Sequence, residues 1–406
     1  MTFFLWYLIA SSILGIGFAY LGWRLISVSK LPPRWRQISW GALTGLFALL
    51  VISIILQTNS IEEPTGIVAW VTYVILGLGS SLLTLVVIRD LFFLLAKGLK
   101  KAGEVWQKTF RSASDETHPT DEGRRQVLMN TVNLAIMGVA ASMTAYGIYE
   151  ARRRPALVTV DVPIRNLHPD LEGFRIVQLT DIHAGLTIRK GFVEAIAEMT
   201  QELNGDIIAF TGDLVDGSVH ELRDDVSPMT FLKAPYGKFF VTGNHEYYSG
   251  AEQWVEEADR LGFTVLNNEH RVVQKGGGRI LLAGVTDFTG GQFVPSHASN
   301  PEKAVENAPA SDAKILLAHQ PKSLYRALPL GFDLQISGHT HGGQFFPWNL
   351  LATVGQPYIS GLHRHENTWV YVSRGTGYWG PPVRLASRSE ITVLRLTRGE
   401  TGSRAT

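Results

Sequence analysis

The residues that most clearly suggest chemistry lie in one glycine-rich stretch, Ser337-Gly338-His339-Thr340-His341-Gly342-Gly343-Gln344. Two imidazoles one residue apart, bounded by glycines, have almost no apolar surface to bury and are typical of ligands. The preceding residues 332–337 predict a short strand. Both histidines would then lie in the loop at its carboxyl end, where open α/β sheets place their sites. Surface loops also carry such pairs by chance, so the pair alone identifies nothing.

Four more predicted strands, at residues 174–179, 206–210, 238–241 and 314–318, end in similar residues. Asp and His two positions apart at the end of a strand share a face and can converge on one point. One such strand end is usually a turn, but five of them hold five of the twelve histidines and predict a shared site. In chain order the residues are Asp181 and His183, Asp213, Asn244 and His245, His319, and His339 and His341.

The composition narrows the ligand chemistry. The chain of 406 residues contains no cysteine, which excludes disulfides and thiolate metal sites. Any metal must therefore be held by nitrogen and oxygen. The net charge of +1 gives no field that would attract nucleic acid, so no nucleic-acid partner is expected.

The first third of the chain has the composition of membrane helices. Four nearly uncharged runs predict transmembrane helices at about residues 3–23, 38–57, 67–88 and 127–148. Each is close to the length of about 20 residues that a bilayer core of roughly 30 Å requires. The alternative is that some are buried helices of a soluble domain. Residues 1–154 are therefore predicted to form a transmembrane region, and residues 155–400 a second domain of α/β type.

Basic residues near the ends of these runs predict the orientation. The first and third connections carry eleven Lys and Arg, whereas the second carries none. By the positive-inside rule the first and third connections face the cytoplasm. The second domain is then expected on the extracytoplasmic side of the cell membrane. Arg152, Arg153 and Arg154 argue for the opposite side. Arg124-Arg125 ahead of an apolar run resembles a twin-arginine export signal, or is an ordinary basic flank of a helix.

Taken in order, these strand-end motifs resemble the complete signature of the calcineurin-like metallophosphoesterases, over about residues 170–345. The ending at 374–384 and the Gly342-Gly343-Gln344 extension look like the membrane-associated or exported bacterial branch of that family. The resemblance implies a two-sheet β-sandwich flanked by helices, here preceded by a bundle of four transmembrane helices. The motifs are Asp181-x-His183, Gly212-Asp213, Gly243-Asn244-His245-Glu246, His319 and Gly338-His339-x-His341.

The resemblance also implies a site for two divalent metal ions. One ion would take Asp181, His183 and His341, the other Asn244, His319 and His339, and Asp213 would bridge them. Such nitrogen and oxygen ligands suit Mn, Fe or Zn. A metal-activated hydroxide would then attack phosphorus directly.

Two further residues receive catalytic roles from the resemblance. His245 corresponds to the non-ligand histidine that stabilises the transition state or protonates the leaving oxygen, and Asp216 to the carboxylate that orients it. Glu246 is either a support for the ligands or a surface residue. The protein Ser/Thr phosphatases have Arg where this chain has Gly217, which speaks against a phosphoprotein substrate. The remaining histidines considered, His220, His270, His297, His363 and His365, fall outside the signature and are expected at the surface.

The sequence therefore predicts a membrane-anchored phosphoesterase acting on phosphodiesters or pyrophosphates. Aromatic residues at 345–351 and at 378–379 suggest an apolar wall, and with it a lipid-linked or nucleotide-sugar substrate, unless these aromatics belong to the core. Two alternatives stay open: a nuclease of the same fold, which the net charge disfavours, and a non-catalytic membrane sensor or scaffold. A scaffold would be expected to have lost a ligand, and all seven are present.

Overall fold

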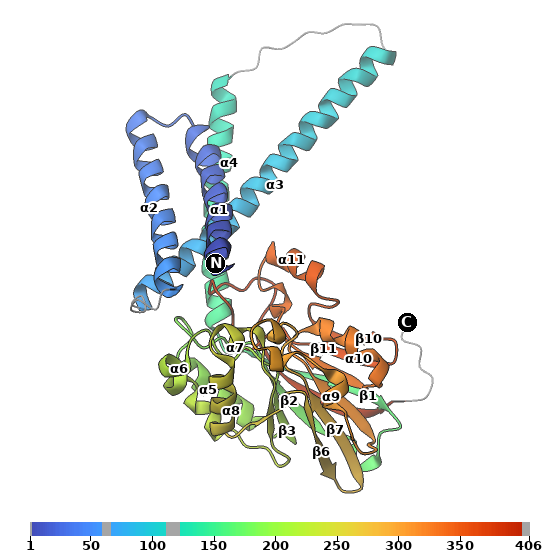
Figure 1. Cartoon of the computed structure of the whole chain (residues 1–406). Helices are drawn as coiled ribbons and strands as arrows, with labels where there is room; N and C mark the ends of the chain where they lie inside the picture. Colours follow the sequence, from blue (N-terminus) through green and yellow to red (C-terminus); the bar gives the residue numbers. More distant parts are fainter. Residues whose placement is uncertain (1, 59–65, 111–121, 400–406) are drawn as a thin grey trace. The chain divides into compact units, whose positions relative to one another are not determined.

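The computed structural model describes residues 2–58, 66–110 and 122–399 (Figure 1). The chain folds as two units, Met1–Tyr146 and Gly147–Thr406. The division falls inside the helix α4, ahead of the boundary at 154 and 155 that the sequence suggested.

The first unit consists of long helices. They are α1 (Thr2–Gly22), continued by the π-helical turn η1 (Trp23–Ser27), α2 (Pro33–Thr58), α3 (Gly66–Phe110) and α4 (Glu122–Arg152). Within the described residues, three stretches are long and apolar enough to cross a membrane: Pro33–Ser53, Gly66–Trp106 and Glu122–Arg152. The structure thus gives three candidate spans where four were expected. α1 covers the run expected at 3–23, but the side chains of residues 1–7 lie outside the described part.

The helix α3 extends well past the run expected to end near residue 88. Its 45 residues correspond to about 68 Å at the usual rise, roughly twice the thickness of the hydrocarbon core. Lys97, Lys100 and Lys101 belong to the same continuous helix and are exposed.

Three charged side chains of the first unit, Arg24, Arg89 and Asp90, are bonded to one another. Arg24 donates to both carboxylate oxygens of Asp90 at 2.5 Å, and Arg89 Nη2 lies 2.8 Å from Asp90 Oδ1. Arg89 also donates to Asn133 of α4. An unpaired charge near the bilayer core is costly, so these bonds hold η1, α3 and α4 together at their polar positions.

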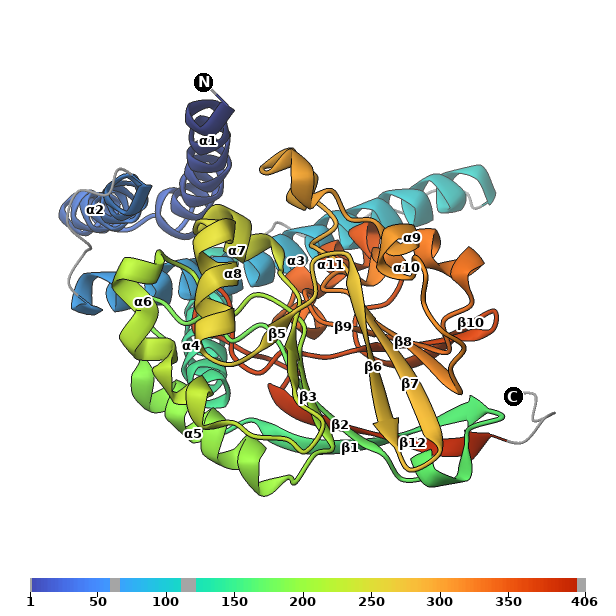
Figure 2. The same cartoon turned by 60° about the horizontal axis from the view of Figure 1, so that its bottom comes forward.

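The second unit contains two mixed six-stranded sheets packed face to face (Figure 2). The first sheet has the order β1 (Ala156–Arg165), β12 (Glu390–Gly399), β2 (Arg175–Leu179), β3 (Ile207–Phe210), β4 (Lys238–Phe240), β5 (Thr264–Val265). The second has the order β10 (Gly361–His365), β11 (Thr368–Val372), β9 (Leu334–Ser337), β8 (Ala313–Leu317), β7 (Gly278–Gly284), β6 (Glu269–Lys275).

Most neighbouring strands run parallel. β2 to β5 are parallel in the first sheet, as are β11, β9, β8 and β7 in the second. Parallel strands carry their carboxyl ends to one edge, so the loops that leave β2, β3, β4, β8 and β9 can meet. The two-sheet fold implied by the family resemblance is confirmed.

Helices cover the outer faces of the sandwich. The longer ones are α5 (Lys190–Glu202), α6 (Val219–Val226), α8 (Ala251–Arg260) and α11 (Trp348–Gly355), and the shorter ones α7 (Asn244–Tyr248), α9 (Pro301–Ala304) and α10 (Leu324–Ala327). Single 3-10 turns lie at Pro169–Leu171, Ser227–Phe231, Gly290–Gln292, Pro295–His297, Pro321–Ser323, Leu328–Leu330 and His341–Gly343.

The strand β2 shows why the sandwich holds its site loops firmly. Ile176 packs into the core between the sheets, whereas Val177 and Leu179 pack toward Val193 and Ile196 of α5 on the outer face. Each fully buried aliphatic side chain contributes roughly 1.5–3 kcal/mol. β2 is thus covered on both faces, although the pattern that identified it in the sequence is its alternation at period two, with Arg175 and Gln178 between apolar residues.

Candidate metal centre

Five loops from the two sheets bring the predicted residues together. The loops after β2, β3 and β4 carry Asp181 and His183, Asp213, and Asn244 and His245, while those after β8 and β9 carry His319, and His339 and His341. Asp181, His183, Asp213, Asn244, His319 and His341 are buried, and His245, Asp216 and His339 are half-buried.

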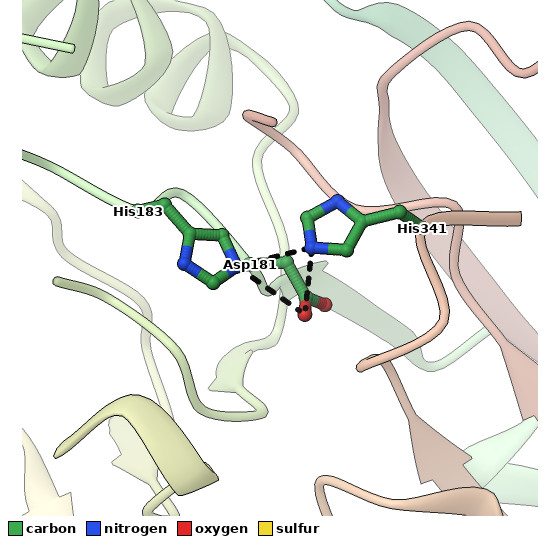
Figure 3. Close-up of side chains that lie close together, drawn as sticks. All are labelled: Asp181, His183 and His341. Carbon is green, nitrogen blue, oxygen red and sulfur yellow. Dashed lines mark hydrogen bonds and ion pairs between the residues drawn. The ribbon is translucent and has the colours of Figure 1, made fainter. Parts of the chain in front are cut away.

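Asp181, His183 and His341 form one cluster (Figure 3). His341 Nε2 lies 3.5 Å from Asp181 Oδ1 and 3.0 Å from His183 Nε2. His183 Nε2 is 3.9 Å from Asp181 Oδ1. His183 and His341 are 158 positions apart in the sequence, so this convergence belongs to the fold and not to a local motif.

Asp213, His319 and His339 form a second cluster. His319 Nε2 lies 3.0 Å from Asp213 Oδ2 and 3.2 Å from both His339 Nδ1 and Asn244 Oδ1. Asp213 Oδ2 is also 3.7 Å from His183 Nε2 of the first cluster. The carboxylate of Asp213 therefore lies between the two clusters.

The backbone at the site is strained. Among the described non-glycine residues, thirteen have positive φ, and five of them are Asp181, His183, Asp213, His339 and His341. Such conformations are uncommon outside glycine and persist where the surrounding structure enforces them, often at functional sites.

Two glycines of the motifs are required by carboxylates on other loops. A Cβ on Gly338 would lie directly on the Asp181 carboxylate, and one on Gly243 directly on that of Asp213. Each glycine beside a ligand in one motif thus makes room for the ligand of another.

Hydrogen bonds set the protonation of two imidazoles. His319 Nδ1 donates to the carbonyl oxygen of Thr211 at 2.7 Å, and His183 Nδ1 donates to Asp216 Oδ1 at 2.8 Å. Both rings are then oriented with Nε2 toward the clusters, which is the arrangement that metal-binding histidines adopt.

His245 lies beside both clusters and is held by the same carboxylate as His183. Its Nδ1 is 2.6 Å from Asp216 Oδ1, and its ring stands edge-on to that of His183 at 4.6 Å. Burial would lower the pKa of His245, but the charges of Asp213 and Asp216 outweigh it and raise the pKa to about 9. Burial likewise opposes ionisation of Asp216, yet His183 and His245 hold its pKa well below the ordinary value.

Glu246 is fully buried and supports two of the site loops. Its carboxylate accepts hydrogen bonds from the backbone N–H groups of Gly243 at 2.6 Å, Asp213 at 3.0 Å and Leu214 at 2.8 Å. Burial raises the pKa of Glu246 to about 7. Of the two roles that the sequence left open for this residue, the structure shows the supporting one.

The comparisons with known proteins agree with this geometry. The family model described as calcineurin-like phosphoesterase matches residues 174–343. A Danio rerio protein named "Transmembrane protein with metallophosphoesterase domain" is 34% identical over 402 residues, covering 96% of this chain and 88% of that protein. The chain belongs to the calcineurin-like phosphoesterase family.

Two further relatives extend the similarity. An uncharacterized metallophosphoesterase of Helicobacter pylori is 39% identical over 276 residues, which cover 67% of this chain and 72% of that protein. A Bos taurus transmembrane protein with a metallophosphoesterase domain is 40% identical over 274 residues, covering 65% of this chain and 62% of that protein. This calcineurin-like phosphoesterase thus has relatives named as transmembrane proteins.

The donor set of this phosphoesterase fits divalent metal ions. Burial lowers the pKa of His339 to about 3 and holds the pKa of His341 well below its ordinary value, which keeps both imidazoles neutral. Burial favours the neutral form of Asp213, but the charges of His319 and His245 outweigh it and leave the pKa well below the ordinary value. Asp213 in turn raises the pKa of His319, against its burial, so His319 would release a proton on binding a metal ion. Neutral imidazoles and carboxylates are the ligands that Mn, Fe and Zn accept.

Other histidines stay outside these clusters, as the sequence suggested. His363 Nε2 bonds to the carbonyl oxygen of Ser360 at 2.7 Å, and His365 Nδ1 to the hydroxyl of Tyr358 at 3.0 Å. His297 Nδ1 lies 3.1 Å from the hydroxyl of Tyr247, and His220 is exposed. His270 Nδ1 bonds to the carbonyl oxygen of Ala304.

Two buried residues near the site were not identified from the sequence. Asp287, just past β7, accepts two bonds from Gln320, the neighbour of His319, at 2.9 and 3.1 Å. Its position after a predicted strand was a usable signal. Arg384 contacts His341 from the far end of the chain, and no local pattern indicates that contact.

The aromatic residues proposed as an apolar wall separate into two groups. Phe345 and Tyr378 are buried core residues, whereas 39% of Phe346 and 53% of Trp379 is exposed. The Trp348 side chain lies outside the described part. Trp379 and Tyr248, both exposed, flank His245 with ring centroids at 5.7 and 5.1 Å.

Proposed function

We propose that this protein is a membrane-anchored, dinuclear-metal phosphoesterase that hydrolyses phosphodiester or pyrophosphate bonds. The observation that carries the proposal is the convergence of seven ligand-type side chains from five loops, with Asp213 within 4 Å of both clusters. Neither cluster alone would favour a dinuclear site. The shared carboxylate does, because one residue can then serve two ions.

Asp181, His183 and His341 would hold one ion, and Asn244, His319 and His339 the other, with Asp213 shared. The ions, Mn, Fe or Zn, would polarise the phosphate oxygens and lower the pKa of a water molecule so that it attacks phosphorus.

His245 and Asp216 would handle the proton of the leaving group. Asp216 accepts a hydrogen bond from His245 Nδ1 and fixes the ring, so that Nε2 can face the substrate. As the bond from phosphorus to the leaving oxygen breaks, Nε2 donates its proton to that oxygen. Glu246 keeps the loops that carry Asp213 and Asn244 in register through its three backbone bonds.

The hydrolytic proposal is tested with the full-length protein in detergent. With Mn²⁺ or Zn²⁺ it is expected to hydrolyse a chromogenic phosphodiester at least about 1,000-fold faster than Asp213→Ala, since metal activation supplies several kcal/mol. Equal rates for the two proteins would support the scaffold alternative instead.

Exposed aromatic side chains support a substrate with an apolar group, such as a lipid-linked or nucleotide-sugar phosphate ester. Trp379, Tyr248 and Phe293 are exposed, and the Phe293 and Tyr248 rings are 5.4 Å apart. Trp379→Ala and Phe346→Ala should each impair hydrolysis of a lipid-linked ester more than that of a small soluble ester. Equal losses on the two substrates would reject this substrate class.

The metallophosphoesterase domain is proposed to lie on the extracytoplasmic side. The support is the excess of basic residues in the first and third connections. A reporter fused after Pro155 should be active only if it is one that works outside the cytoplasm. Activity of a cytoplasmic reporter at the same position would reverse this orientation.

A further inference from the structure

The loop between β11 and β12 lies against the first cluster. We call residues 374–387 the C-terminal clasp, and we propose that this clasp, through Arg384, positions His341 and Asp181 so that one of the two cation sites depends on it and the other does not. The proposal rests on the dinuclear function proposed above, and it goes beyond that function by giving the two ions different structural supports.

Arg384 is 1% exposed, and its donors are taken up by the clasp and by His341. Nη1 donates to the carbonyl oxygen of His341 at 3.3 Å, and Nη2 lies 3.0 Å from His341 Nδ1. The remaining bonds reach the carbonyl oxygens of Gly377, Arg374 and Ser387 at 2.6–2.9 Å. One side chain therefore bonds to the backbone of a ligand and to three carbonyl oxygens of the clasp, and it packs against the ring of that ligand.

Within the described residues, no carboxylate forms an ion pair with Arg384. A buried guanidinium is costly unless its donors are satisfied, and here the carbonyl oxygens of four residues satisfy them. The positive charge of the Arg384 guanidinium would also be repelled by a metal ion bound nearby. The geometry of its five N–H donors, rather than its charge, thus accounts for an arginine at this position.

The rest of the clasp supports the same cluster. Ser387 Oγ donates to the His341 carbonyl oxygen at 2.6 Å. The backbone N–H of Gly377 donates to the carbonyl oxygen of Asp181 at 2.9 Å, and that of Thr376 to Thr180 at 2.8 Å. Gly377 is required there, since a Cβ would lie on the carbonyl oxygen of Ile182.

The second cluster has different supports. Among the described residues, no hydrogen bond from the clasp reaches Asp213, Asn244, His319 or His339. His319 is held by the carbonyl oxygen of Thr211 just past β3, and Asp213 by the N–H of His245 at 2.9 Å. Removing Arg384 should therefore release His341 while leaving the second cluster in place.

Arg384→Met tests the inference, with metal content as the readout. Full-length protein is loaded with Mn²⁺ and desalted, its manganese is measured by mass spectrometry, and the electron paramagnetic resonance spectrum separates coupled from isolated Mn²⁺. Wild type should retain about two ions per chain with a coupled spectrum, and Arg384→Met about one ion with an isolated spectrum. Arg384→Lys, which keeps one donor group, should restore part of the second ion.

Arg388→Met is the matched control. Arg388 is an exposed arginine beside the clasp, with a single bond of 3.4 Å to the carbonyl oxygen of Arg154, and this variant should keep two ions. Two coupled ions in Arg384→Met, or loss of both, would overturn the inference. Wild type without a dinuclear centre would instead reject the proposed function itself.

A milder variant decides the case if Arg384→Met does not fold. Ser387→Ala removes a single bond to the same carbonyl oxygen of His341. It should weaken retention of one ion several-fold, leave the other unchanged and keep the thermal unfolding midpoint near that of wild type. Unchanged affinity for both ions would count against the clasp.

Discussion

The two halves of the metal centre are built differently. The cluster of Asp181, His183 and His341 is assembled from residues 158 positions apart and is supported by side chains, with Asp216 on one histidine and Arg384 on the other. In the cluster of Asp213, His319 and His339, the backbone carbonyl oxygen of Thr211 orients His319, and the Glu246 carboxylate binds the backbone of the loops. Single substitutions can remove the side chains that contact the histidines of the first half, whereas no substitution removes the carbonyl group that orients His319.

Asp213→Asn should have the largest effect, because Asp213 is the residue common to both halves. Loss of one carboxylate charge between the clusters should lower kcat/KM by about 1,000-fold or more and remove both ions. Activity assays and metal analysis on the same preparation check this outcome. Retention of one full ion would show that the halves do not share this carboxylate.

His245→Gln should reduce turnover without affecting either half. The expected loss in kcat is about 100- to 1,000-fold for an ester with a poor leaving group, since general acid catalysis contributes about that much. The loss should be much smaller for p-nitrophenolate, which leaves without a proton, and the metal content should be unchanged. A loss independent of the leaving group would contradict the proton-donor role.

Glu246→Gln should weaken the second half through its loops. The amide offers one acceptor where the carboxylate accepts three backbone N–H groups, and its own NH₂ faces donors. We expect the free energy of unfolding of Glu246→Gln to fall by about 2 kcal/mol, which lowers the unfolding midpoint by roughly 5 °C. Glu252→Gln, on the exposed face of α8, is the control and should not change the midpoint.

Gly338→Ala should disturb the first half by overlap with the Asp181 carboxylate. We expect a loss of affinity for one ion, with the second ion retained, as measured by metal titration. Gly191→Ala is the matched control, because a Cβ at Gly191 would meet nothing within 4 Å. Equal metal binding by both variants would show that the loop after β9 can shift without cost.

The smallest expected effect is on the pH dependence of stability and comes from Lys238, which lies away from both halves. Its ammonium donates to the carbonyl oxygens of Leu261 at 2.7 Å and Met229 at 2.9 Å, and burial lowers the pKa of Lys238 to about 8. Between pH 8 and the unfolded value of 10.5 the unfolded chain binds more protons, so stability increases with pH in that window. The gain in the free energy of unfolding is expected to be about 1 kcal/mol. From pH 8 to 10 the unfolding midpoint of wild type should therefore rise by a few °C relative to that of Lys238→Met. A constant difference would show that Lys238 titrates normally.

The sequence predicted local structure well where a strand is covered on both faces. β3 is a continuous apolar run, β8 is apolar apart from Lys314, and β2 alternates around Arg175 and Gln178. These local patterns predicted the three strands without tertiary information. β6, β10, β11 and β12 were not predicted. β6 and β10 are edge strands with charged residues and histidines, such as His363-Arg364-His365, and they lack an apolar run. β12 alternates as a strand should, but its pairing with both β1 and β2 could not be read from the alternation.

The order and type of residues by themselves determined the set of candidate ligands, the absence of thiolate ligands and the apolar helices that precede the phosphoesterase domain. Only the tertiary structure decided which of these side chains lie together, why glycines stand beside them, and that Arg384 reaches His341. The physical reason is the distance along the chain over which each kind of interaction acts. Periodicity and turn chemistry act over a few residues, whereas a metal centre is made by backbone pairing and side-chain bonds between segments that the chain separates by more than a hundred positions.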